Sequence, residues 1–89
     1  MKKVVYSLTK VTKEGVQKET GIGFVINNDL LVAKISKKSN NAYIQVYESA
    51  TKDCKQLEDN SYKGTFDQIL NIENRTVVVD YMLWFKEVE

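Results

Sequence analysis

The chain has 89 residues, of which 43% are hydrophobic and 28% charged, so we expect one globular domain spanning residues 1–89 and not a disordered segment. It has no histidine and a single cysteine, which excludes histidine-based catalytic sites, a typical structural zinc site and an internal disulfide. The net charge is +1, but residues 1–40 carry eight lysines against three acids, whereas residues 41–89 carry five cations against nine acids.

The N-terminal half alternates between apolar and polar residues with the period of a β-strand. Val4, Tyr6 and Leu8 share one face of the first predicted strand, and the segments 20–26, 30–36 and 42–48 continue as strands. Polar turns separate them at residues 13–15, 27–29 and 37–41. Four strands joined by short turns predict an antiparallel meander.

Two segments of the C-terminal half are less regular. Ala50, Cys54 and Leu57 have the i, i+4, i+7 spacing of one helix face, so we expect a short helix or a turn there. Residues 64–73 fit either a strand, in a hairpin that turns at 73–74, or a helix with a capping box at its start. The β-branched run 76–79 predicts a final strand.

These elements predict an all-β fold with at most one short helix. We expect a small antiparallel barrel of five or six strands, or a strongly twisted sheet. In a closed barrel the first and last strands would pair, which would leave no exposed sheet edge. Gly21 and Gly23 lack the third glycine and the following helix of a dinucleotide-binding loop, so we expect them to mark a bend or a close backbone approach.

The final strand carries the most unusual surface. Its predicted core face contains Val77, Val79, Tyr81, Leu83 and Phe85. The opposite face presents Val78, Asp80, Met82 and Trp84. Asp80 is thus expected to reach water, but three large apolar neighbours are atypical of a solvent-facing surface. Either residues 50–58 cover this face, or another protein chain does, and Trp and Met are enriched at interface cores.

The basic N-terminal half supports an alternative function. Small barrels bind single-stranded nucleic acids by combining a cationic groove with exposed aromatic rings. The residues that would serve here are Lys3, Lys10, Lys34, Lys37, Lys38 and Tyr43. The chain contains only one arginine and is nearly neutral, however, whereas dedicated nucleic-acid binders are usually clearly basic.

We therefore expect a non-enzymatic protein-binding module, with a regulatory, inhibitory or accessory role, that binds a partner or forms a homodimer through its C-terminal strand. No cofactor or metal is expected, because the acids near Cys54 lack the spacing of a calcium loop, and Cys54 itself is expected to be a small buried side chain. The lysine- and asparagine-rich composition suggests a bacterial or phage protein. The absence of a signal-peptide pattern and of a long apolar run predicts a cytoplasmic protein that does not enter a membrane.

Overall fold

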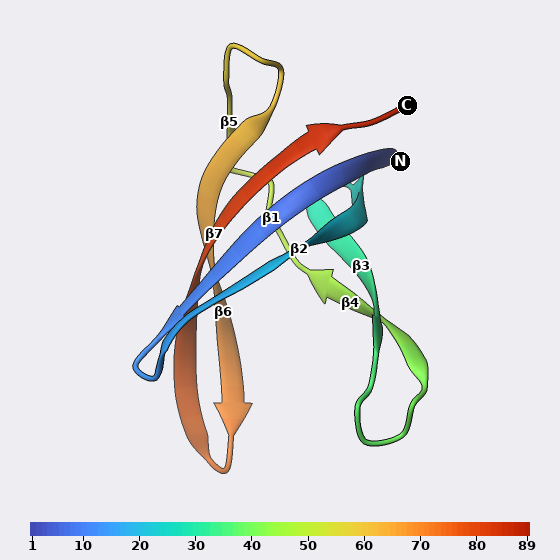
Figure 1. Ribbon diagram of the computed structural model, residues 1–89. Coiled ribbons are helices and arrows are strands. Elements are labelled where there is room, and N and C mark those ends of the chain that lie inside the picture. The colour runs from blue at the N-terminus through green and yellow to red at the C-terminus, as the bar shows by residue number, and fades with distance from the viewer.

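The computed structural model describes all 89 residues and contains one sheet of seven antiparallel strands (Figure 1). The strands are β1 (Lys2–Thr12), β2 (Gly15–Ile26), β3 (Asp29–Ile35), β4 (Ala42–Tyr47), β5 (Lys55–Gln56), β6 (Tyr62–Ile72) and β7 (Arg75–Glu87). The predicted all-β antiparallel fold is confirmed. The count exceeds the predicted five or six strands because β5, only two residues long, adds to the six long strands. The structure contains no helix that is long and apolar enough to cross a membrane.

The strand order is β4-β3-β2-β1-β7-β6-β5, which places the first and last strands side by side at the centre of the sheet. The two termini consequently lie together (Figure 1). This pairing was predicted, but it does not remove the sheet edges, because β1 and β7 are interior strands and the edges are β4 and β5. The sheet instead curls until its two ends meet through side chains, with the rings of Tyr47 in β4 and Phe66 in β6 6.0 Å apart.

The predicted turns are confirmed by the backbone. Asn27 and Asn28 both have positive φ angles, of 48° and 71°, and Glu73 and Asn74 have φ angles of 49° and 64°. Two consecutive residues of this kind form the hairpin turn whose twist matches that of the flanking strands. Residues 64–72 belong to strand β6, which ends at the 73–74 turn, and the helical alternative for this segment is wrong.

The other expected helix, over residues 50–58, is also absent, and the alternative of a turn is correct. Ser49 has a φ of 56°, which a right-handed helix does not allow. Its N–H donates to the Asp29 carboxylate at 2.8 Å, and the Thr51 N–H donates to the Asn28 carbonyl at 3.0 Å. The backbone bonds within the segment span only three residues, as in turns (Cys54 N–H donates to the Thr51 carbonyl at 3.2 Å), and Lys55–Gln56 form β5.

We call the concave side of the curled sheet the inner face and the convex side the outer face. The inner face carries a core of eleven buried hydrophobic residues: Val4, Tyr6, Leu8, Leu30, Val32, Tyr47, Ala50, Val79, Tyr81, Leu83 and Phe85. In β2 the inner positions near this core are Gly21 and Gly23. A Cβ atom at Gly23 would lie 2.9 Å from the Leu31 carbonyl oxygen, so this glycine marks the close backbone approach that was predicted. The apolar side chains between and beside the glycines therefore face outward.

The molecule exposes more surface than its mass requires. Only 13 of the 89 residues are buried, and the accessible surface is 6944 Å². A compact monomer of 10.2 kDa is expected to expose about 5,300 Å². The surplus of roughly 1,600 Å² arises because the long hairpins extend beyond the core, and it leaves ample area for contacts with other molecules.

Candidate functional site

The outer face of β7 is exposed to solvent. Asp80 is exposed, while Val78 and Met82 on either side of it are 57% and 46% exposed. Trp84, the fourth predicted residue, is half-buried. The opposite face of β7 enters the core, except for Val77, which lies near the end of the hairpin and is 38% exposed.

Residues 50–58 do not cover this outer face. Ala50 is fully buried in the core on the inner side of the sheet. Cys54 lies against the inner side of β6, where a Cβ atom at Gly64 would come within 2.8 Å of the Cys54 Cα atom. The intramolecular cover considered from the sequence is therefore wrong, and the apolar outer face of β7 has no partner within the chain.

Neighbouring strands extend the outer face of β7 into a larger patch. Asp67 of β6 lies directly opposite Asp80 in the ladder, and Ile69 lies opposite Val78. On the other side of β7, Val11 of β1 is the partner of Asp80. We call this set the acid-pair patch: Val11, Asp67, Ile69, Val78, Asp80 and Met82. All six residues are exposed, and Ile69, at 70%, is the most exposed of the four apolar ones.

Asp80 perturbs Asp67, its partner in the ladder. The hydrogen bond that Asp67 shares with Asp80 raises the pKa of Asp67, and slight desolvation and the negative charge of Asp80 act in the same direction. Like charges directly opposite each other in a β-ladder destabilise the sheet. The pair is thus an unbalanced negative charge set among exposed apolar side chains.

Trp84 lies beyond Met82 on the same face, and its ladder partners are Ser7 of β1 and Lys63 of β6. These residues line a shallow groove of about 400 Å³ that reaches Met82 and so adjoins the acid-pair patch. All four partner-binding residues predicted from the sequence therefore share one continuous surface.

The six residues of the nucleic-acid alternative do not form one surface. Lys3 lies on the outer face opposite Phe24, and Lys38 lies in the turn between β3 and β4. Tyr43 is exposed and is the ladder partner of Lys34. Lys10, Lys34 and Lys37, by contrast, line a cavity on the inner face. The structure brings Lys10, Lys34 and Lys37 together in this cavity and places Tyr43 next to Lys34 on the same face, whereas Lys3 and Lys38 do not line the cavity.

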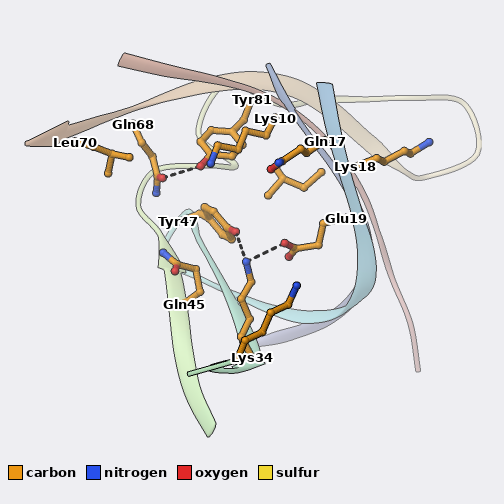
Figure 2. Close-up of a pocket in the computed structure, with 12 residues that line it drawn as sticks. Lys10, Gln17, Lys18, Glu19, Lys34, Gln45, Tyr47, Gln68, Leu70 and Tyr81 are labelled. Carbon is orange, nitrogen blue, oxygen red and sulfur yellow. Dashed lines mark hydrogen bonds and ion pairs between the residues drawn. The ribbon is translucent and has the colours of Figure 1, made fainter. Parts of the chain in front are cut away.

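This inner cavity was not predicted. It has a volume of about 580 Å³ and is lined by side chains of the inner face (Figure 2). Each of the six long strands contributes a polar side chain to it: Lys10 from β1, Gln17 and Glu19 from β2, Lys34 from β3, Gln45 and Tyr47 from β4, Gln68 from β6 and Tyr81 from β7. Lys10 and Lys34 continue the inward alternation of Leu8 and Val32, so strand phase was the signal that could have revealed it.

A hydrogen-bonded network organises one wall of the cavity. The Lys34 ammonium donates to Glu19 Oε1 and to Tyr47 Oη, each at 2.8 Å (Figure 2). The Tyr6 hydroxyl donates to the other Glu19 oxygen at 2.5 Å. Across the cavity, the Tyr81 hydroxyl donates to Gln68 Oε1 at 3.1 Å.

The charges of this network stabilise one another. Partial burial alone would raise the pKa of Glu19, but the hydrogen bonds from Lys34 and Tyr6 outweigh it, so the pKa of Glu19 is lowered. Burial alone would lower the pKa of Lys34, but the bonds to Glu19 and Tyr47 raise it. Burial, followed by the bond to Glu19, raises the pKa of Tyr6. Lys34 and Glu19 are therefore both ionised near neutral pH.

The geometry gives little support for metal binding or for a reactive thiol. No group of three or more acidic or cysteine side chains comes together in an arrangement for a metal ion. Cys54 is partly buried against the core, and burial together with the charge of Asp53 raises the pKa of its thiol, which opposes formation of a reactive thiolate. Searches against protein-family models, curated proteins and solved structures give no match.

Proposed function

We propose that this protein is a non-enzymatic binding module that docks a partner protein on the outer face of β6, β7 and β1. The observation that carries this proposal is the acid-pair patch, in which four exposed apolar side chains surround two paired carboxylates and nothing from the chain covers them. Contiguous exposed apolar surface of this kind marks interaction sites in soluble proteins.

The charge of the patch selects the chemistry of the partner. An arginine or lysine placed between Asp67 and Asp80 would relieve their mutual repulsion, and a guanidinium can donate to carboxylates at two points. Apolar side chains next to that cation would cover Ile69, Val78 and Met82, and a large one would fit the groove beside Trp84. A second copy of this chain fits the patch less well, because a two-fold axis there would bring the acid pairs of both copies together.

Selection from a random peptide display library tests this proposal without knowledge of the natural partner. We expect the immobilised protein to enrich peptides that carry arginine or lysine flanked by apolar residues. The double variant Asp67→Asn/Asp80→Asn should abolish the preference for the cation. The double variant Ile69→Thr/Val78→Thr should weaken binding of a selected peptide by about tenfold or more.

A matched control separates the patch from apolar surface in general. Ile35 and Ile44 are 67% and 59% exposed, close to the 70% and 57% of Ile69 and Val78, but they belong to β3 and β4. Ile35→Thr/Ile44→Thr should bind the selected peptides as the wild type does. If no peptide is enriched, if the enriched peptides are acidic, or if the control variant loses binding equally, the proposal is wrong.

Self-association as a homodimer is a separate prediction, and the edge of the sheet at β4 favours it. Residues 42–47 carry no charge, proline or bulge, the usual devices that protect an edge strand from pairing with another chain. Light scattering at micromolar concentration should show a dimer, which Ile44→Lys should dissociate. The nucleic-acid alternative would instead be supported if the wild type bound oligodeoxythymidine with an affinity that falls steeply as salt rises.

We also propose a cytoplasmic, bacterial or phage setting for this module. The half-buried free thiol of Cys54 is compatible with a reducing compartment. The composition, rich in lysine and asparagine with one arginine, is typical of proteins from AT-rich genomes. Fractionation of bacterial cells that express the protein would test the compartment.

A further inference from the structure

The inner cavity has an excess of positive charge that the protein does not neutralise. Four lysines line it (Lys10, Lys18, Lys34 and Lys37), against one acid, Glu19. Glu19 pairs with Lys34, and this is the only ion pair in the structure. Lys18 points away from the cavity in Figure 2. Lys10 and Lys37 thus remain as two uncompensated cations at a partly enclosed site, whose low-dielectric walls strengthen their field.

The rest of the lining offers hydrogen bonds and little apolar contact. The Tyr47 hydroxyl accepts a hydrogen bond from Lys34, which leaves its own hydrogen for another acceptor. The amides of Gln17 and Gln45 also line the cavity. Only four of the twelve lining residues are hydrophobic, and two of these are tyrosines with hydroxyl groups. A ligand for this site is therefore charged and rich in acceptor oxygens.

We propose that the inner cavity binds a small organic anion that carries at least two phosphate or carboxylate charges. Two negative charges match the two uncompensated lysines, and acceptor oxygens match the Tyr47 hydroxyl and the glutamine amides. The volume of about 580 Å³ lies within the range of roughly 300–1,000 Å³ found for small-molecule sites. Small barrel-like sheets can enclose a ligand cavity, and in this one each of the six long strands contributes a polar side chain to the lining. This site is distinct from the acid-pair patch, which attracts cations.

Isothermal titration calorimetry at low salt can test the proposal with four probes. Inorganic pyrophosphate, citrate and adenosine diphosphate represent phosphate, carboxylate and nucleotide ligands, and adenosine is the uncharged control. We expect at least one anion to bind with a one-to-one stoichiometry, and the tightest of the three identifies the source of the charge. Adenosine should not bind. Absence of binding by all three anions at millimolar concentration would overturn the proposal, as would equal binding of adenosine and its diphosphate.

Neighbouring lysines provide the matched control. Lys37 lines the cavity, whereas Lys38, the next residue of the same turn, does not. Lys37→Gln and Lys10→Gln should each weaken anion binding by about tenfold, a typical effect of removing a charged hydrogen-bond donor. Lys38→Gln should change it by less than about twofold. Equal losses in Lys37→Gln and Lys38→Gln would show attraction to the general surface charge and overturn the proposed site.

Nuclear magnetic resonance locates the bound anion directly. The side-chain amide signals of Gln17, Gln45 and Gln68 should shift on titration, while the backbone signals of Ile69 and Val78 in the acid-pair patch should not. Shifts confined to the outer face would overturn the assignment. The patch variant Ile69→Thr/Val78→Thr should bind the anion as the wild type does, so failure of either proposal leaves the other intact.

Discussion

Replacement of Gly23 by alanine should destabilise the fold, whereas the same replacement at Gly21 should not. Both glycines face the inner side of β2, and neither has a left-handed backbone, so their φ angles do not distinguish them. The two positions differ in the space available for a Cβ atom. A Cβ at Gly23 would lie 2.9 Å from the Leu31 carbonyl oxygen and 3.2 Å from a methyl group of Leu30, whereas at Gly21 the nearest atom is a Tyr6 ring carbon at 3.4 Å.

The expected magnitude follows from these contacts. The Leu31 carbonyl belongs to the backbone of β3, so it can move only with its strand. Overpacking of this kind typically costs about 1–3 kcal/mol, and removal of a glycine from a strand returns roughly 0.5–1 kcal/mol. We therefore expect Gly23→Ala to lower the free energy of unfolding by about 1–2 kcal/mol, and the Tm by roughly 5–15 °C for a domain of this size. Gly21→Ala should leave stability unchanged or raise it by up to about 1 kcal/mol.

Urea unfolding followed by Trp84 fluorescence and thermal unfolding followed by circular dichroism would measure both variants. A Gly23→Ala protein as stable as the wild type, or a Gly21→Ala protein equally weakened, would refute this account of β2. The outcome also bears on the inner cavity, since the close approach at Gly23 helps to hold together the strands that carry Glu19 and Lys34.

Three further predictions concern other positions. Gly64→Ala should also lower the Tm, because the new Cβ would lie 2.8 Å from the Cys54 Cα atom, and Cys54→Ala should not restore the loss since the clash includes backbone. Asp67→Asn should raise the Tm at about pH 7 but not below pH 3.8, the ordinary pKa of an aspartate. The reason is that the pKa of Asp67 is raised in the folded state. Ionisation of Asp67 therefore destabilises the fold as the pH rises from 3.8 through the raised value. Alkylation of Cys54 by iodoacetamide near pH 8 should be about tenfold slower in the folded protein than in concentrated urea, because burial and Asp53 raise the thiol pKa, and equal rates would contradict the buried position.

Local patterns in the sequence predicted the strands and turns well. The alternation around Val4, Tyr6 and Leu8 and the turn residues at 27–29 are properties of short segments, so they needed no knowledge of the rest of the fold. The turn over 50–58 was harder to predict. The helical spacing of Ala50, Cys54 and Leu57 is present in the sequence, but long-range bonds to Asp29 and Asn28 decide the conformation of that segment. The strand order likewise depends on which distant strands pair.

The same distinction between local patterns and long-range contacts applies to the candidate surfaces. Strand alternation alone was sufficient to place Val78, Asp80, Met82 and Trp84 on the outer face. Asp67 was missed because its pairing with Asp80 depends on the register of β6, a segment that the sequence left open between strand and helix.

The inner cavity was missed for a different reason. In β2 the apolar residues Ile22 and Phe24 point outward, while Gly21, Gly23 and Glu19 point inward. Hydrophobicity, the main guide to the buried face of a strand, therefore suggests the wrong side there. The close backbone approach at Gly23 leaves no space for a side chain on the inner face, and this accounts for the outward orientation of Ile22 and Phe24.

The polar wall of the cavity is not the solution that stability alone would favour. At the other end of the inner face, the same strands place Val4, Leu30 and Leu83 in a fully buried apolar core. Replacement of a partly buried ion pair such as Lys34–Glu19 by apolar residues is often neutral or stabilising. A chain with only 13 buried residues would gain from such an extension of its core. A requirement other than stability therefore best explains the network, and under the anion-binding proposal that requirement is the binding of a ligand in the inner cavity. The basic half of the sequence supplies the lysines of the inner face and the acidic half supplies the aspartates of the outer face, so the two proposed sites would bind ligands of opposite charge.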